Sequence, residues 1–335
     1  MREPNRIILP ALVAALFLAL GCGGGHARDG DVAVDFIEDE DGADDAVEVP
    51  AEPEPERPDG PEEADGPADG EEEGPDGGCA DACAWGQACV SGECLYPESI
   101  TLTILDDTYI FDERLSASGG FSCWVTGLDA AILLDTGFDA VTLLSNMDIL
   151  GVNAADAGYA MLSHDHTDHT AGLRAFLARR SGIPVFLPAS FREAAVTAIS
   201  DAGATPVLVS DPQALTDGAW STGEMGVEIK EHGLLLATAE GPVLVTGCAH
   251  PGIVSIVEGA MEVSGAAELF LVAGGFHLRD MTEDQIRPII EQLQALGVRK
   301  VAPTHCTGDL AIGMFEAAYG ADFIRLGAGQ VVTLP

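Results

Sequence analysis

Short apolar runs alternate with longer amphipathic stretches from about Pro97 to the end of the chain. Runs of about four to eight residues that are rich in β-branched or aromatic side chains and bounded by turn residues are typical of strands. Such runs predict strands over residues 101–105, 121–127, 130–137, 159–164, 184–188, 269–275 and 298–305. A hairpin is also expected over residues 232–247, turning at Glu240 and Gly241.

The amphipathic stretches between these runs predict helices. Residues 171–182 place Leu173, Phe176 and Leu177 on one face and end at a glycine. Three more helices are expected, over residues 190–203 with Ser190 as the N-cap, after Pro251, and from Thr282 to Leu296. Hairpins followed by strand–helix units favour an α/β (α+β) fold in which helices cover the outer faces of two sheets.

Histidines gather at the ends of the predicted strands. His164, His250, His277 and His305, four of the eight histidines, lie at or just past a strand end. The segment that begins at the first of them, His164, reads "HDHTDH". Because ligand sites of α/β sheets lie at the ends of the strands, we expect these side chains to meet at one rim of the sandwich.

This set of side chains predicts a metal centre. Imidazole nitrogens and carboxylate oxygens suit zinc and related divalent ions. His164 and His166 point the same way if the segment is extended, and Asp168 and His169 can turn toward a second ion. The candidates outnumber the ligands that one ion uses, which indicates a pair of ions about 3.5–4 Å apart. A polar loop without metal is the alternative, but it would desolvate many ionisable groups without a cation.

The start of the chain predicts export. Residues 1–22 combine Arg2 and Arg6 with an apolar run that is too short for a comfortable membrane span, as in a signal peptide. The run ends in "ALGC", which resembles the lipobox of bacterial lipoproteins, with Cys22 as the lipid-bearing residue. We therefore expect an exported protein of the cell envelope, lipid-anchored to a bacterial membrane. An ordinary signal peptide or an uncleaved anchor is the alternative.

Residues 23–78 predict a disordered acidic linker. Between residues 29 and 76 there are roughly 22 acidic side chains and one basic side chain, Arg57, with repeated proline and glycine. Such a segment cannot bury enough apolar surface to offset its ordering entropy, and it fits an extended tether. A binding tail is the alternative. The net charge of -40 argues against nucleic acid as a partner, because phosphates would be repelled.

Four closely spaced cysteines, Cys79, Cys83, Cys89 and Cys94, define a small segment over residues 79–96. Outside the cytoplasm, two disulfides are the preferred interpretation, with three possible connectivities. A tetrathiolate zinc site is the alternative, but no histidine accompanies the cysteines. Residues 97–335 then form one large domain.

Several motifs of this large domain resemble a known family. "HDHTDH" matches the metal signature of the metallo-β-lactamase-fold hydrolases, and "LLDTG" at 133–137 matches their upstream aspartate motif. "TGCAHPGI", "AGGFHL", "PTHCTGD", "GFSCWV" and "SNMDILGVN" resemble the branch of the dihydropterin–ribofuranosylaminobenzene-phosphate synthase-like proteins. The resemblance covers about residues 100–335 and implies a four-layer αββα sandwich.

The resemblance also implies roles for individual residues. His164, His166 and His250 would hold the first ion, and Asp168, His169 and His305 the second. Asp135 would orient the ligand loop from behind, and Asp168 and His277 are the candidate catalytic residues. The cofactors would be two divalent ions, zinc or else manganese or iron. Gly275 stands where most of the wider superfamily has a bridging aspartate, so His277 either replaces that ligand or faces the substrate.

The leading hypothesis is a metal-dependent hydrolase in which a metal-bound hydroxide attacks an ester, with a phosphorylated small molecule as substrate. The resembled family suggests a dihydropterin-linked synthase, a transferase, as one alternative. The expected export argues against it, because the phosphorylated precursors would be cytoplasmic. A surface module that binds metal and ligand without turnover is the alternative of a different class.

Overall fold

The computed structural model describes residues 83–91 and 93–335 of the 335-residue chain. The predicted leader, the acidic linker, Cys22 and Cys79 lie outside the described residues. Within the described ranges, no helix is both long and apolar enough to cross a membrane.

Two sheets face each other in the large domain. The first has seven strands, in the order β15 (Val331–Leu334), β3 (Ile100–Asp106), β4 (Ser122–Thr126), β5 (Ala131–Leu134), β6 (Ala157–Met161), β7 (Pro184–Pro188) and β8 (Thr205–Val209). The second has six, in the order β14 (Val298–Thr304), β13 (Leu269–Gly275), β12 (Val243–Thr246), β11 (Leu234–Leu236), β10 (Ala219–Ser221) and β9 (Gln213–Thr216).

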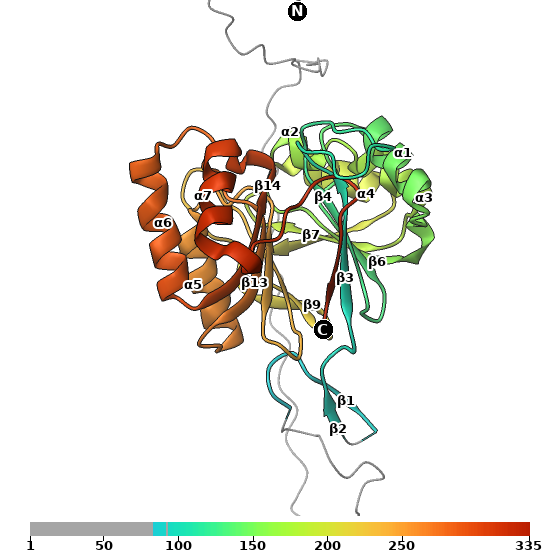
Figure 1. The fold of residues 1–335 in the computed structure, drawn as a ribbon. Helices are drawn as coiled ribbons and strands as arrows, with labels where there is room; N and C mark the ends of the chain where they lie inside the picture. The colour runs from blue at the N-terminus through green and yellow to red at the C-terminus, as the bar shows by residue number, and fades with distance from the viewer. Residues whose placement is uncertain (1–82, 92) are drawn as a thin grey trace, which may run out of the picture. The chain divides into compact units, whose positions relative to one another are not determined.

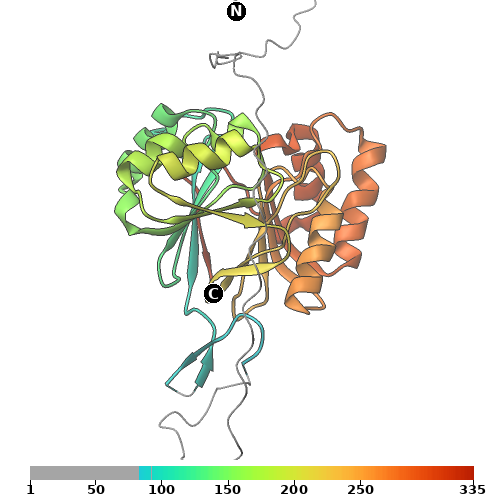
Figure 2. The same cartoon turned by 180° about the vertical axis from the view of Figure 1, so that it is seen from behind.

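Helices cover the outer face of each sheet, as Figure 1 and the reverse view in Figure 2 show. The first sheet carries α1 (Ala140–Leu150), α2 (Thr167–Thr170), α3 (Leu173–Arg179) and α4 (Glu193–Asp201) on its side of the molecule. The second carries α5 (Ile253–Ser264), α6 (Glu283–Ala295) and α7 (Asp309–Tyr319). The predicted α/β sandwich with two outer helical layers is therefore confirmed.

Three apolar layers hold this sandwich together. The central layer joins the two sheets, with Ile104 and Leu134 facing Leu234 and Leu271. One outer layer packs α1 and α3 on the first sheet, and the other packs α5, α6 and α7 on the second. The strand β13 is buried along its whole length, which explains its continuous apolar sequence, because a strand between two layers has no solvent face.

Parallel pairing sets where the loops meet. Strands β5, β6, β7 and β8 pair in parallel, and so do β12, β13 and β14. The carboxyl ends of parallel strands lie at the same edge of a sheet, and loops from that edge build ligand sites. The loops that follow β6, β12, β13 and β14 carry the histidines of interest.

The helix expected from Ser190 begins later than predicted. Its N-cap is Arg192, and α4 starts at Glu193. Residues 188–191 instead form a turn, in which the backbone N–H of Phe191 donates to the carbonyl of Pro188. Ser190 donates its backbone N–H to Glu224 at 2.7 Å, and α4 has no side-chain cap hydrogen bond. The predicted N-cap was therefore wrong, because Ser190 belongs to the turn that precedes the helix.

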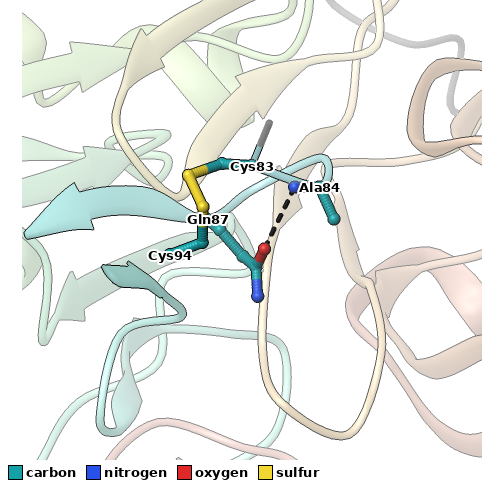
Figure 3. Close-up of a disulfide and its surroundings, with 4 residues drawn as sticks. All are labelled: Cys83, Ala84, Gln87 and Cys94. Atoms are coloured by element: carbon teal, nitrogen blue, oxygen red, sulfur yellow. Dashed lines mark hydrogen bonds between the residues drawn. A yellow bond between two sulfur atoms is a disulfide. The ribbon is translucent and has the colours of Figure 1, made fainter. Parts of the chain in front are cut away.

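The cysteine-rich segment forms a hairpin of β1 (Ala88–Val90) and β2 (Glu93–Leu95). A disulfide joins Cys83 to Cys94, and the side-chain oxygen of Gln87 accepts a hydrogen bond from the Ala84 N–H beside it (Figure 3). Cys89 is also disulfide-bonded. A four-thiolate zinc site is therefore excluded for these cysteines.

Trp85 attaches this hairpin to the sandwich. Its ring lies against Trp220 of β10, with ring centroids 4.8 Å apart. The adjacent Gly86 adopts φ +81° and approaches Ala237 so closely that a Cβ would lie 2.1 Å from the alanine methyl. Only glycine combines this backbone conformation with this approach. The hairpin lies at the end of the sandwich away from α2 (Figures 1 and 2).

Candidate metal centre

Three histidines form the first candidate ligand set. The Nε2 atom of His164 lies 3.0 Å from Nδ1 of His166 and 3.2 Å from Nε2 of His250. Asp165, between the first two, points away and pairs with Arg192 at 2.7 and 2.8 Å. The segment is therefore extended, and alternate side chains face opposite ways. His164 and His166 point to the same place, as the spacing predicts.

A second candidate set lies beside the first. The single helical turn α2 begins after His166 and turns Asp168 and His169 inward. The carboxylate Oδ2 of Asp168 lies 3.6 Å from Nε2 of His169 and 3.4 Å from Nε2 of His305. Cys248 Sγ lies 3.2 Å from Nε2 of His169. The ligand atoms of these four residues are all within 4.8 Å of one another.

The side chain of His305 indicates that the second set is built for a cation. It is buried, and neither of its ring nitrogens has a hydrogen-bond partner among the described residues. The carboxylate of Asp168 is within ion-pair range of Nε2 but is not in hydrogen-bond geometry. A buried polar group without a partner is costly, and a divalent ion would supply that partner. The residues present therefore fit a metal ion.

The nitrogens of the first set support the same conclusion. A neutral imidazole carries one N–H and one lone pair. Burial, followed by the neighbouring histidines, lowers the pKa of His164 well below its usual value, so this ring stays neutral. Three imidazole nitrogens that converge within about 3 Å cannot all be paired as donors and acceptors. A cation bound between them satisfies all three lone pairs.

Asp135 supports both ligand sets from behind. Its Oδ1 accepts the backbone N–H of Ser163, and its Oδ2 accepts the hydroxyl of Ser163 and lies next to Nδ1 of His169, each at 2.7 Å. Burial disfavours the charged ring of His169, but the Asp135 carboxylate outweighs burial and raises the pKa to about 9. A carboxylate at Nδ1 leaves Nε2 free to bind a metal and fixes the ring orientation.

Glu231 is a functional residue that the sequence did not reveal. It is fully buried, and burial raises its pKa. Its Oε1 accepts the backbone N–H groups of Gly247, Cys248 and Ala249 at 2.9–3.1 Å, and Oε2 accepts that of His250 at 2.9 Å. One carboxylate therefore shapes the whole loop that carries His250. A single acidic residue before an apolar run has no spacing pattern that would have identified this role.

Asp107 holds the loop of His305 in a similar way. Its Oδ2 accepts the hydroxyl of Thr304 at 2.6 Å, and its Oδ1 accepts the backbone N–H of His305 at 3.3 Å. Burial raises the pKa of this carboxyl to about 6. Asp107 directly follows β3, which lies in the other sheet from β14, so both sheets fix the position of His305.

Backbone strain gathers at the same rim. In the described residues, five non-glycine positions have positive φ, and four of them, Asp135, Ala249, His277 and His305, belong to this site. Such conformations cost of order 1–3 kcal/mol each and persist only where the surrounding structure enforces them. The hydrogen bonds to Glu231 and Asp107 provide that enforcement for Ala249 and His305.

His277, the predicted catalytic histidine, lies at the exposed side of the cluster. Its ring centroid is 4.3 Å from that of His250, and its ligand atom lies within 4.8 Å of those of His250 and Cys248. Gly275 has no space for a side chain, because a Cβ would lie 2.3 Å from the carbonyl oxygen of Gly247 and 2.7 Å from Cys306 Sγ. A bridging carboxylate at residue 275 would require the backbone to move.

A buried histidine outside the ligand sets leads to a pH prediction. His232 donates from Nε2 to the carbonyl of Leu162 at 2.9 Å, while Nδ1 lies 2.8 Å from the hydroxyl of Ser221. Burial lowers its pKa from 6.5 to about 4. In the unfolded chain His232 binds a proton below about pH 6.5, whereas in the folded protein it does so only below about pH 4. The free energy of unfolding therefore decreases as the pH falls from about 6.5 to about 4.

We expect this residue to contribute on the order of 3 kcal/mol to that loss, since one pKa unit corresponds to about 1.4 kcal/mol. Urea unfolding of wild type and His232→Gln at pH 7 and pH 4 measures it. The loss of unfolding free energy should be smaller in the variant, and the difference between the two proteins removes the contribution of the other histidines. Equal losses would contradict the assignment of a neutral, buried His232.

The amino-acid sequence was compared with those of known proteins. No family model matches the sequence. The chain is 33% identical to the 7,8-dihydropterin-6-methyl-4-(β-D-ribofuranosyl)-aminobenzene-5′-phosphate synthase of Methanocaldococcus jannaschii, over 62% of this chain and 85% of that protein.

Solved structures agree on the fold. A metal-dependent hydrolase of the β-lactamase superfamily covers 70% of this chain and 98% of its own, with 25% identity and a TM-score of 0.57. A metallo-β-lactamase fold protein from Bacillus subtilis covers 71% of this chain and 100% of its own, with 12% identity and a TM-score of 0.55. The expected αββα fold of the metallo-β-lactamase type is confirmed.

Proposed function

Because the chain belongs to the family of the dihydropterin–ribofuranosylaminobenzene-phosphate synthases and has the metallo-β-lactamase fold, we propose that it is an enzyme that hydrolyses an ester with two bound divalent ions. The ions would be zinc, or else manganese or iron. The observation that carries the proposal is the convergence of His164, His166 and His250 beside Asp168, His169 and His305, with unpaired buried nitrogens. Bound divalent ions supply Lewis acidity, which lowers the pKa of water and polarises a substrate oxygen.

Two residues at the rim would orient the attacking water and donate a proton to the leaving group. Asp168 keeps its pKa below the usual range, because the neighbouring rings of His169 and His305 favour the charged carboxylate and outweigh the effect of burial. It therefore stays ionised and can accept a hydrogen bond from the attacking water. His277 is exposed, and a hydrogen bond with Cys306 raises its pKa. Its imidazolium can donate a proton to the leaving oxygen as the ester bond breaks.

A phosphoester is the proposed substrate class. Arg279 lies two residues after His277, and its Nη2 donates to the carbonyl oxygen of His305 at 3.1 Å, which holds the guanidinium at the rim. A guanidinium with further donors is suited to phosphate oxygens. The relative from Methanocaldococcus jannaschii is named for a product that carries a 5′-phosphate, which agrees with this class.

Synthase activity is the second candidate, and the name of the same relative favours it. We also propose that the protein is exported and lipid-anchored through Cys22, since the first 22 residues read as a leader that ends in a lipobox. This proposed location outside the cytoplasm would separate the enzyme from phosphorylated cytoplasmic precursors. It therefore favours hydrolysis over the synthase reaction.

Removal of metal tests the proposed function. We expect the purified protein to hydrolyse a chromogenic phosphodiester, to lose that activity on dialysis against a chelator, and to regain it with zinc or manganese. Both elemental analysis and the release of chromophore would be followed. Retention of metal without turnover of phosphodiesters, phosphomonoesters or carboxylic esters would contradict the proposal and indicate a binding module. Hydrolysis that survives complete metal removal would also contradict it.

A further inference from the structure

We propose that Cys248 is a metal ligand, the fourth protein ligand of the second ion beside Asp168, His169 and His305. The inference rests on the proposed metal centre and extends it. The two ligand sets would then differ in the number of protein ligands. The second ion would have four and no open coordination position, whereas the first ion would have three histidines and one open position. Protein zinc sites with four ligands are typically structural, and those with three are typically catalytic.

The distances within the second set agree with tetrahedral coordination. Zinc–nitrogen bonds of ~2.0–2.1 Å and zinc–sulfur bonds of ~2.3 Å place neighbouring ligand atoms roughly 3.3–3.6 Å apart. The structure has 3.2 Å between Cys248 Sγ and His169 Nε2, 3.6 Å between Asp168 Oδ2 and His169 Nε2, and 3.4 Å between Asp168 Oδ2 and His305 Nε2. The other three pairs of ligand atoms lie within 4.8 Å, so the four side chains can close on one ion at the centre of the set.

The loop that carries Cys248 is built to present two ligands in different directions. Glu231 holds the backbone N–H groups of Cys248, Ala249 and His250, and Ala249 between the two ligands has φ +63°. His250 therefore faces the first set while Cys248 faces the second. A cysteine that only filled space would not need a strained residue and a buried carboxylate to aim it.

Gly275 explains why a thiol is needed here. A side chain at residue 275 would collide with the backbone of Gly247 and with Cys306, so β13 contributes no carboxylate. Cys248 lies within 4.8 Å of ligand atoms in both directions, toward His169 and His305 and toward His250 and His277. The Cys248 sulfur therefore lies between the first and the second ligand set.

The charges also balance. On binding, the S–H bond of Cys248 and the Nε2–H bond of His169 each give a proton to solvent, and the freed lone pairs of sulfur and nitrogen bind the cation. The thiolate and the carboxylate of Asp168, with two neutral imidazoles, then cancel the charge of a divalent ion, which removes the cost of burying an unpaired charge. The first set supplies only neutral histidines, so its ion keeps its full charge for the substrate.

Cobalt substitution tests the ligand directly. We expect the full chain loaded with cobalt(II) to show a thiolate-to-cobalt charge-transfer band in the near ultraviolet. The band should be lost in Cys248→Ser and in Cys248→Ala and kept in Cys306→Ser. Cys306 is a matched control because its Sγ lies 3.6 Å from the carbonyl oxygen of Cys248, yet its sulfur belongs to neither ligand set. Elemental analysis after dialysis should find less metal per chain in the two Cys248 variants than in wild type, because the second ion would keep only three of its four ligands.

Each outcome decides the matter. A band that persists without Cys248, or that disappears with Cys306 alone, overturns the inference. Wild-type protein that binds two ions and hydrolyses phosphodiesters without a thiolate band overturns the cysteine ligand but leaves the proposed function intact. Wild-type protein that binds no metal overturns both. The unfolding transition of each variant, measured without metal, separates loss of a ligand from loss of the fold.

Discussion

Replacement of Glu231 by alanine should destabilise the protein by on the order of 4 kcal/mol or more and abolish metal binding by His250. Four backbone N–H groups, those of residues 247–250, would lose their acceptor, and the first three of them are buried. Each unsatisfied buried donor costs about 1–3 kcal/mol. The loop could then no longer hold Ala249 in its left-handed conformation, and His250 would leave the first set.

Urea unfolding and elemental analysis measure the two effects of this substitution. Glu231→Gln should lie between wild type and alanine, because its amide oxygen can still accept three N–H groups while its NH₂ faces the N–H of His250. Glu228→Ala is the control, since this exposed neighbour should change stability by less than about 0.5 kcal/mol. An unchanged unfolding midpoint in Glu231→Ala would refute the role assigned to this carboxylate.

His166→Ala should lower phosphodiester hydrolysis by at least about 100-fold, more than the 10–100-fold typical for residues that only support a ligand. The reason is that the first set would keep two of its three histidines and bind its ion weakly. The imidazole is partly exposed, so its removal should leave the fold intact. Asp165→Asn is a matched control one residue away, because Asp165 pairs with Arg192 and points away from the site. Equal metal content in His166→Ala and wild type would remove the site assignment.

The sequence was informative wherever a local pattern decided the structure. Strands such as β7 and β13 are continuous apolar runs because layers cover both their faces, and such runs are visible without tertiary knowledge. The histidines could be predicted to meet because parallel strands end at one edge. The structure brings His164, His166 and His250 into one group and Asp168, His169 and His305 into the other. Their roles as ligands stay predictions until metal is measured.

The supports of the site could not be predicted in the same way. Asp107 contacts His305 across 198 residues, and Glu231 binds a loop 16 to 19 residues away. Neither contact has a short-range signature, because the pairs are set by how the two sheets and their loops close on each other. The same reasoning applies to Cys248, whose position beside His169 depends on contacts 79 residues apart. Helix α1 was missed although Asp139 caps it and Gly151 ends it, since its residues lack a strong apolar face.

The position of the disulfide-bonded hairpin has a practical consequence. Trp85 fixes the hairpin to the end of the sandwich away from α2, and α2 carries Asp168 and His169. Any support coupled to the protein through the hairpin side, whether a bead or a sensor surface, would leave the imidazole rim facing solution. Oriented immobilisation at this end should therefore preserve access for small molecules, whereas coupling through α2 or the neighbouring loops should block it.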